Sequence, residues 1–501
     1  TRGPRPAGSP DVALSAAADY RDTLKSYGVL VDPEVRMDVI RFQAQTLAEG
    51  VGGAIPDDPA LLEEVTHLVE VPTALLGSFE EKYLDLPQEV LIAVMKKHQR
   101  YFPVLDDEGR MLPYFITVRN GGRENLDIVR EGNEGVIRAR YADAAYFYAQ
   151  DTKRPLDDFV PELHKLTFQE DLGSMLDKTE RLEALAMWLG ARLGISALEL
   201  DLLQRAGHLC KADLATEMVV EMTSLQGIMG MKYALLSGEP DAVAQAIFEH
   251  YLPRSADDML PTSQIGMTLA LADRLDSLAG LFAVGMEPTG TSDPYGLRRA
   301  AAGLVQILLD RGLSFSVREG LIEAARLMPV EDAAETVEAA LAFVVGRLQV
   351  MLRDEGFAHD VVEAVLAERG ADPARARESA RQLAAWVERE DWQHILDSYA
   401  RCVRITRDQP HLALDPAQLE DPASEALYEA LLAVEGKVSP ESGVDDLFNL
   451  FLPLIPPIEQ FFDNVLVMAD DEALRTARLA LLQRIARLAE GIVDLSRLEG
   501  F

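Results

Sequence analysis

The sequence predicts a mostly α-helical protein that opens with a small α+β domain. Apolar residues recur at helical spacing through most of the chain after residue 133. Near the start, two short runs of aromatic and β-branched residues flank the turn sequence DDEG, which predicts one β hairpin. Apolar residues make up 48% of the chain and charged residues 26%, so a globular core can be buried.

Residues 1–155 are expected to form the α+β domain. Helical patterns cover the segments 11–27, 33–49, 59–71 and 87–97. The sequence GVGGAIPDDP interrupts them at 50–59, and Pro72 predicts a turn. The hairpin strands are expected at 101–105 and 113–118.

Helices are expected to fill two further regions, 156–330 and 331–501. Asn133 is predicted to cap one long helix that ends near KRP (153–155). After the loop GMEPTGTSDPYG, Asp293 and Pro294 predict the start of a helix that runs to Leu309. The last two helices are expected near Pro457 and at 471–489.

The charge and cysteine content limit the function classes. The net charge of −35 opposes nucleic-acid binding unless cations are gathered locally. The segment from residue 96 to 154 contains 11 Lys and Arg and 9 Asp and Glu, so its net charge is close to neutral. Two distant cysteines exclude a disulfide framework and a CxxC site, and a reducing cytoplasmic location is expected.

Several sequence signatures are missing. No apolar run reaches the roughly 18–20 residues that span a membrane, so no membrane association is expected. The chain carries no P-loop, GxGxxG, HExxH or GxSxG motif, nor the signatures of class I aminoacyl-tRNA synthetases. One hairpin is also too small for the antiparallel sheet of a class II synthetase core. No catalytic residue is therefore predicted in this chain.

One scattered group of residues has the side chains of metal ligands: His208, Asp213, His250 and Asp273. Helical metal-dependent phosphohydrolases of the HD superfamily arrange such residues around an adjacent His-Asp pair. Here the pair position reads Lys211-Ala212-Asp213, so the defining histidine is missing. We expect a degenerate HD-like helical domain at 156–330 and no metal ligands.

Long sequence words resemble the β subunit of bacterial heterotetrameric glycyl-tRNA synthetase. They include MKKHQRYFPV (95–104), EGNEGVIRARYADAAYFYAQDTKRPL (131–156) and LALADRLDSLAGLFAVGMEPTGTSDPYGLRRAA (269–301). The closing segment 448–489 is similar to the helical anticodon-binding domain of arginyl-tRNA synthetases. Because family members carry further N-terminal sequence and this chain starts at Thr1, an N-terminal truncation is expected.

The resemblance implies a division of labour. A separate α subunit would hold ATP, Mg²⁺ and glycine in an α2β2 assembly, with no cofactor in this chain. The chain itself would bind tRNA(Gly) and position it. Two rival functions stay open: an HD-type phosphohydrolase and a stand-alone tRNA-binding protein. An amidotransferase subunit that acts on mischarged tRNA fits these motifs less well.

The predicted tRNA-binding residues are mainly cations on five short segments: Lys96, Lys97, His98, Gln99, Arg100, Arg138, Arg140, Arg298, Arg299, Arg401, Arg404, Arg475 and Arg478. Lys and Arg neutralise phosphates, and unpaired bases stack on aromatic rings. The cluster 96–100 is interpreted either as a phosphate grip or as a salt-bridge network. Of Tyr101 and Phe102, one is expected in the core and the other is free to stack on a base.

For the other arginines, contacts within the chain are alternatives to tRNA binding. Arg138 and Arg140 should point to different faces of one helix, so that one of them can face a partner and the other pairs with Asp143 or Glu134. Arg298 and Arg299 bind either an anionic partner or local carboxylates such as Asp273 and Asp276. Arg401 and Arg404, like Arg475 and Arg478, are three residues apart and share a face. Phe461 and Phe462 are expected in the core, and Gly227 and Gly230 are expected to allow close helix packing.

Overall fold

The protein divides into two compact units. The computed structural model describes residues 1–331 and 333–501, and the side chain of His98 lies outside that description. Unit 1 joins Thr1–Leu166 to Leu209–Phe248, and unit 2 joins Thr167–His208 to Glu249–Phe501. The segment Leu209–Phe248 therefore folds with the N-terminal part of the chain. The predicted boundaries near 155 and 330, and the HD-like character of the middle segment, stay predictions.

Unit 1 contains short helices around a small sheet. Its helices and strands are α1 (Tyr20–Ser26), α2 (Pro33–Glu49), α3 (Pro59–Leu68), β1 (Pro72–Ser78), α4 (Gln88–Val94), β2 (Phe102–Leu105), β3 (Met111–Asn120), α5 (Leu126–Asp151), α8 (Glu217–Glu221), α9 (Ile228–Leu236) and α10 (Asp241–Glu249). The mostly helical fold class and the β2–β3 hairpin are confirmed.

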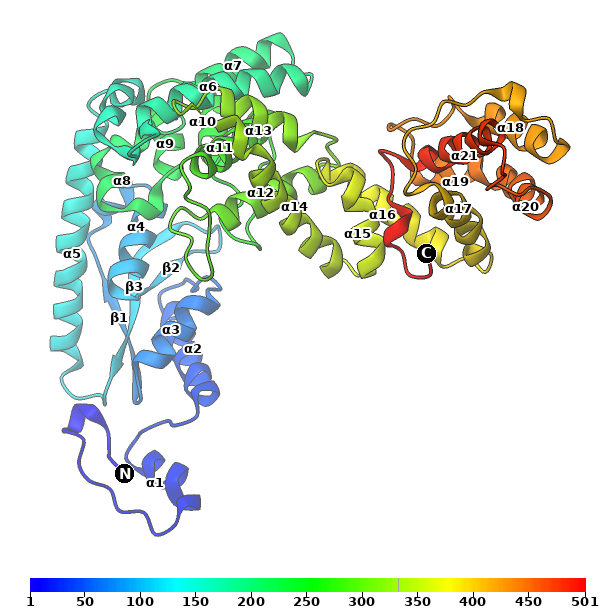
Figure 1. Cartoon of the computed structure of the whole chain (residues 1–501). Coiled ribbons are helices and arrows are strands. Elements are labelled where there is room, and N and C mark those ends of the chain that lie inside the picture. The colour runs from blue at the N-terminus through cyan, green and yellow to red at the C-terminus, as the bar shows by residue number, and fades with distance from the viewer. Residues whose placement is uncertain (332) are drawn as a thin grey trace. The chain divides into compact units, whose positions relative to one another are not determined.

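The sheet of unit 1 has three antiparallel strands in the order β1-β3-β2. One face packs against α2 and α3 through a core that includes Ile40, Leu62 and Ile116, and α5 contacts β1 (Figure 1). Burying each large aliphatic side chain contributes roughly 1.5–3 kcal/mol. Gly77 pairs with Phe115 across the strands, and a Cβ at that glycine would collide with the phenyl ring.

Both Tyr101 and Phe102 are buried, at 3% and 2% exposure. Phe102 belongs to the core between sheet and helices. Tyr101 stacks on Phe115, with ring centroids 4.8 Å apart, and its hydroxyl donates to the Asn133 side chain at 2.5 Å. The expectation that one of the two rings is free to stack on a base is therefore wrong.

Three element predictions in unit 1 need correction. The segment 72–78 forms strand β1, where a turn was expected at Pro72, because it pairs along β3 from Pro72–Asn120 to Ser78–Tyr114. The long helix starts at Leu126, seven residues before the predicted cap; Asn133 lies inside it and donates to the Val129 carbonyl at 2.7 Å. The first helical stretch is only α1, preceded by a 3₁₀ turn.

A buried carboxylate ties the end of α5 to the segment 209–248. Asp151, which is 3% exposed, accepts hydrogen bonds from the N–H groups of Glu217 and Met218 at the start of α8. It also accepts one from the Tyr233 hydroxyl of α9, at 2.8 Å. A carboxylate at a helix N-terminus satisfies unpaired N–H groups and the helix dipole. This contact is one of those that join Leu209–Phe248 to the N-terminal part of unit 1.

Unit 2 is almost entirely helical. Its helices and strands are β4 (Thr167–Gln169), β5 (Gly173–Ser174), α6 (Met175–Arg192), α7 (Ala197–Leu209), α11 (Gln264–Ala283), α12 (Leu297–Asp310), α13 (Val317–Arg326), α14 (Val337–Asp354), α15 (His359–Arg369), α16 (Pro373–Val387), α17 (Trp392–Thr406), α18 (Pro422–Val434), α19 (Val444–Phe451), α20 (Ile455–Asn464) and α21 (Glu472–Ala486).

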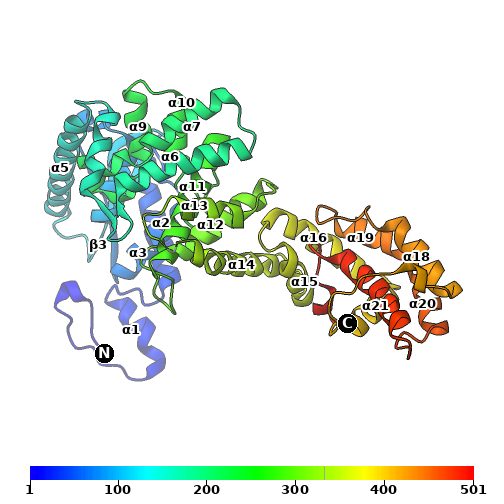
Figure 2. The ribbon, with the colours of Figure 1, turned by 45° about the horizontal axis from the view of Figure 1, so that its top comes forward.

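Helix α11 is the centre of the first half of unit 2. It is buried along most of its length and packs against α6, α12 and α13 (Figure 2). In the second half, α17 packs against α21, and α18 packs against α20. Phe461 is fully buried there, as predicted, whereas Phe462 is only half-buried. Within the described residues, no helix has the length and apolar character that crossing a membrane requires.

Candidate functional site

The cationic segment 95–100 lies between α4 and the sheet. The helix continues into one π-helical turn, Met95–Gln99, and Arg100 then adopts a left-handed backbone with φ of 53°. Two of the cations are neutralised locally: Lys96 pairs with Asp58, and Arg100 Nε lies 2.8 Å from a Glu64 carboxylate oxygen. The salt-bridge interpretation therefore accounts for Lys96 and Arg100.

The other residues of this segment differ from those two. Lys97 is exposed, and no carboxylate in the described part of the chain pairs with it. Gln99 is half-buried, and the side chain of His98 falls outside the described residues. Lys97 is thus the cation of this cluster that stays available to a partner.

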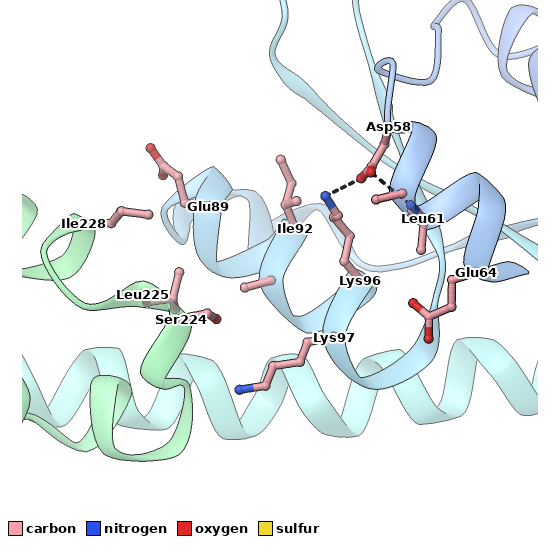
Figure 3. Close-up of a pocket in the computed structure, with 12 residues that line it drawn as sticks. Asp58, Leu61, Glu64, Glu89, Ile92, Lys96, Lys97, Ser224, Leu225 and Ile228 are labelled. Atoms are coloured by element: carbon pink, nitrogen blue, oxygen red, sulfur yellow. Dashed lines mark hydrogen bonds and ion pairs between the residues drawn. The ribbon is translucent and has the colours of Figure 1, made fainter. Parts of the chain in front are cut away.

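An apolar groove of about 560 Å³ lies beside Lys96 and Lys97 (Figure 3). We call it the α3–α4 groove. Three parts of unit 1 line it: α3, α4 and the segment from Ser224 to Ile228. Its aliphatic side chains are Ala60, Leu61, Ile92, Ala93, Leu225 and Ile228. Charged side chains line the groove as well, and the Lys96–Asp58 ion pair lies between Ile92 and Leu61 in Figure 3.

Arg138 and Arg140 are exposed and point to different faces of α5, as their spacing predicts. Arg138 Nε lies 3.0 Å from Glu80, so its predicted partners are wrong. Glu134 instead accepts a hydrogen bond from the backbone of β1. Arg140 and Asp143 line one small cavity of about 290 Å³. Arg140 is consequently the better candidate of the two for an outside partner.

Arg298 and Arg299 lie in the first turn of α12. This helix starts at Leu297, later than predicted, but Asp293 still caps it by accepting the N–H groups of Leu297 at 2.8 Å and Arg298 at 2.9 Å. The Arg298 guanidinium donates to the Gly290 carbonyl at 2.8 Å, and Arg299 is exposed. Arg298 therefore stabilises its own loop, and Arg299 faces solvent.

Asp276, proposed above as a partner of these arginines, serves another buried network. Its carboxylate lies 2.7 Å from both Lys178 Nζ and Arg181 Nε, and Lys178 also pairs with Asp273 at 3.0 Å. Burial works against a charged Lys178, but the two carboxylates outweigh it and raise the pKa of the ammonium. The network holds α6 against α11, so these four side chains stabilise the fold and are not assigned to ligand binding.

Arg401 and Arg404 share one face of α17, as predicted, and each lies over an aromatic ring. The Arg401 guanidinium is 4.3 Å from the Phe462 ring centroid, and that of Arg404 is 5.4 Å from Phe501. Within the described residues neither pairs with a carboxylate. Cation–π contacts hold a guanidinium flat and leave its N–H edges open to an anion.

Arg407 extends this row and was missed in the sequence prediction. It is exposed directly after the end of α17, three residues beyond Arg404. The signal was present in RCVRITR, where arginines recur every third residue. We call Arg401, Arg404 and Arg407 the α17 arginine row.

Arg475 and Arg478 have structural roles. Arg475 donates to the Ala469 carbonyl and Arg478 to the Leu466 carbonyl, both at 2.9 Å. Arg478 also pairs with Asp421 at 3.0 Å, and its side chain is only 11% exposed. Burial favours a protonated Asp421, but hydrogen bonds from Ser424 and Arg478 outweigh it and lower the pKa. Both arginines hold the loop between α20 and α21.

The residues weighed as a metal site make other contacts. His208 Nδ1 lies 3.5 Å from Glu183, Asp273 pairs with Lys178, and His250 is buried. In the described ranges, no group of three or more His, Cys, Asp or Glu is placed to hold a metal ion. The phosphohydrolase interpretation thus gains no support from these side chains.

Asp213, the fourth residue of that group, caps helix α9. Its Oδ2 accepts the N–H groups of Gly227 at 2.6 Å and Gly230 at 3.1 Å. A Cβ at Gly230 would lie 2.7 Å from Ile247, which confirms the predicted close packing at this glycine. Burial is the main reason that the pKa of Asp213 rises to about 6, despite hydrogen bonds that favour the charged form.

This raised pKa predicts a pH-dependent stability. Because the pKa of Asp213 is higher in the folded chain, its contribution is fully present below about pH 4 and is lost as the pH rises through about 6. Each unit by which folding shifts a pKa corresponds to about 1.4 kcal/mol of stability. The rise of the Asp213 pKa from 3.8 to about 6 therefore means a loss of unfolding free energy on the order of 3 kcal/mol. In urea unfolding, Asp213→Asn should gain stability relative to the original chain between pH 4 and 7. A constant difference would contradict this assignment.

The chain is similar to one family of proteins over most of its length. A family model described as glycyl-tRNA synthetase beta subunit matches residues 1–367. The glycine–tRNA ligase beta subunit of Desulforudis audaxviator is 42% identical over 97% of this chain and 71% of its own length. That of Clostridioides difficile is 41% identical over 99% of this chain and 73% of its own length.

A plant protein shares the same similarity within a longer chain. The "Glycine--tRNA ligase, chloroplastic/mitochondrial 2" of Arabidopsis thaliana is 40% identical over the whole of this chain. This chain spans only 47% of that protein's length. With the family model and the bacterial relatives, the similarity covers both units described above. The chain therefore belongs to the glycyl-tRNA synthetase beta subunit family.

Proposed function

We propose that this chain binds tRNA(Gly) and positions it for glycine attachment. A separate α subunit supplies the site for ATP, Mg²⁺ and glycine, in a cytoplasmic α2β2 assembly. The family and the printed names of the bacterial relatives as beta subunits support a partner subunit. The described residues form one three-stranded and one two-stranded sheet, which is consistent with an adenylate-forming core on another chain.

The plant relative supports the same division of labour. Its name designates a glycine–tRNA ligase without a subunit label, and this chain matches about half of it. The other half is long enough to hold a further catalytic domain, given typical domain sizes of about 100–200 residues. A ligase activity spread over more sequence than this chain contains agrees with a non-catalytic role for the chain itself.

The α17 arginine row is the observation that carries the tRNA-binding part of the proposal. Arg401 and Arg404 are fixed over Phe462 and Phe501, and no described carboxylate neutralises them. In a chain of net charge −35, such unneutralised cations are the places where phosphates can bind. Half-buried rings beside arginines also suit the unpaired bases of a tRNA loop.

Aminoacylation with purified components tests the proposal. We expect glycine transfer to tRNA(Gly) when the chain and the cognate α subunit are mixed, and no glycine adenylation by the chain alone. Binding of tRNA by the chain should weaken steeply between about 50 and 200 mM salt, because phosphate contacts release counterions. Adenylation by the isolated chain, or a tRNA affinity that does not change with salt, would refute the proposal. Transfer that needs no added chain would also refute it.

A further inference from the structure

The loop between α11 and α12, residues 284–296, holds an aromatic ring at the surface. Tyr295 is 39% exposed and lies two residues before the start of α12. Its ring meets the half-buried ring of Phe168 in a T-shaped contact, with the centroids 6.3 Å apart. Phe168 in turn contacts Lys178, whose Nζ lies 4.6 Å from the ring centroid. Because Lys178 belongs to the buried network of α6 and α11, Phe168 and Tyr295 are supported from the core of unit 2.

Hydrogen bonds within the α11–α12 loop fix its backbone. Thr289 and Ser292 exchange backbone hydrogen bonds at 3.1 and 2.8 Å. The Arg298 guanidinium donates to the Gly290 carbonyl, and Asp293 caps the first turn of α12. A loop that is ordered before binding loses little conformational entropy when a ligand binds. The exposed ring of this loop therefore needs little further ordering to contact a partner.

An arginine without a carboxylate partner lies against the same loop. Gly296 has a left-handed backbone with φ of 69°, and a Cβ there would lie 2.8 Å from Arg299 Nη2. The exposed Arg299 thus folds back over the residue that follows Tyr295. Asp293 binds backbone N–H groups, and neither Glu287 nor another carboxylate of the described residues pairs with Arg299. The loop therefore presents a ring and an unneutralised cation together.

A second positive charge lies near Arg299. Arg274 is buried, and its guanidinium donates to backbone carbonyls that include those of Ala270 at 2.9 Å and Leu252 at 2.6 Å. Burial is the main cause that lowers the pKa of Arg274 to about 10. The charge of Arg299 also lowers this pKa, whereas the Asp273 carboxylate raises it. Two nearby cations repel each other, so an anion bound at Arg299 would relieve the repulsion.

We propose that Tyr295 and Arg299 form a second tRNA contact of unit 2, in addition to the α17 arginine row. An unpaired base of tRNA(Gly) stacks on the Tyr295 ring, and a neighbouring phosphate binds the Arg299 guanidinium. Every base has an aromatic face, and a guanidinium donates paired hydrogen bonds to phosphate. A protein carboxylate would satisfy the cation but leave the ring uncovered, so the pair suits a nucleotide better. This inference rests on the proposed function, since it takes tRNA as the ligand.

Substitutions of the two side chains in the full chain test this contact. Tyr295→Ala should raise the Kd for tRNA(Gly) about fivefold or more, whereas Tyr295→Phe keeps the ring and should stay within about twofold. Arg299→Ala should raise the Kd by a similar factor and make the plot of log K against log salt shallower by about one. For a blunt RNA duplex without unpaired bases, Tyr295→Ala should bind like the original chain. Fluorescence anisotropy of labelled RNA measures each Kd.

Matched controls change equivalent residues elsewhere. Tyr20 is also 39% exposed, but the neighbouring Arg21 already pairs with Asp32 at 3.4 Å. Arg318 is an exposed cation that already pairs with Glu338 at 2.8 Å. Tyr20→Ala and Arg318→Ala should each leave the Kd for tRNA(Gly) within about twofold, because they remove no ring or cation that is open to a nucleotide.

The outcomes separate this inference from the proposed function. If folded Tyr295→Ala and Arg299→Ala variants bind tRNA(Gly) like the original chain, or no more weakly than the two controls, the loop is not a tRNA contact and the α17 arginine row keeps its role. Weaker binding of the α subunit with unchanged tRNA binding would make the loop a protein contact instead. An original chain that binds no tRNA overturns both proposals. Circular dichroism checks folding, and because Arg299 is exposed, Arg299→Ala tests the contact even if Tyr295→Ala does not fold.

Discussion

Replacing Arg401 and Arg404 together by alanine is expected to lower tRNA(Gly) affinity by at least about tenfold at moderate salt. Both guanidinium groups are fixed over aromatic rings, at 4.3 and 5.4 Å from the centroids, and no described carboxylate competes for them. They therefore lose little freedom when they bind phosphates. The plot of log K against log salt should also become shallower by about one to two, since each phosphate contact releases counterions.

A matched variant shows whether charge or position matters. Arg318 and Arg326 of α13 are exposed cations of the same unit, but each already pairs with a glutamate at 2.8 Å. Their double alanine variant removes the same charge and should leave tRNA affinity within about twofold. Equal losses in both double variants would mean that tRNA responds only to net charge. An unchanged salt slope in the α17 variant would remove the row from the interface.

Replacing Asp276 by alanine is expected to destabilise unit 2 by about 3–5 kcal/mol. The residue is 1% exposed and pairs with Lys178 and Arg181, which are 3% and 7% exposed. Without it, Lys178 would keep its pair with Asp273, whereas Arg181 would lose the carboxylate that it pairs with among the described residues. An unpaired buried charge has lost its hydration without a compensating contact. A lower midpoint in urea, followed by a probe in unit 2, measures the effect.

The control for this experiment is an ion pair at the surface. Glu338 pairs with Arg318 at 2.8 Å, and both side chains are about half exposed or more. Glu338→Ala should cost less than about 1 kcal/mol, because water already screens the pair. If Asp276→Ala shifts the midpoint no more than Glu338→Ala does, the network between α6 and α11 contributes little to stability.

Local sequence signals predicted some elements well. Helix α2 was predicted at 33–49 and forms there, because Asp32 caps its first turn and Pro33 suits the first helical position. Strand β1 was missed because PTALLGS contains a single β-branched residue, and its strand conformation comes from pairing with β3. Asn133 has a typical capping side chain, but the tertiary structure places it inside α5, where it binds Val129 and Tyr101.

The sequence predicted which cationic residues belong to the candidate site, but not which of them are free of carboxylate partners in the folded chain. Within the cluster 96–100, Lys96 and Arg100 are bound by carboxylates from the α3 region, and Lys97 is not. Arg478 was expected to face RNA, yet it is mostly buried against Asp421. The spacing of Arg401 and Arg404 did predict a shared face, because three residues make nearly one helical turn. The shared face of these two arginines could therefore be predicted from helical periodicity alone.

The sequence by itself determined the mostly helical fold, the family resemblance and the segments on which cations are concentrated. Only the tertiary structure decided which cations remain open to a partner. The partners that neutralise them are far away along the chain: Glu64 is 36 residues from Arg100, and Glu80 is 58 residues from Arg138. Short-range propensities depend on neighbours within a turn or two, whereas an ion pair forms wherever packing brings two charges together. The α17 arginine row, Lys97, Arg140 and Arg299 therefore became distinct from the paired cations only once the chain had folded.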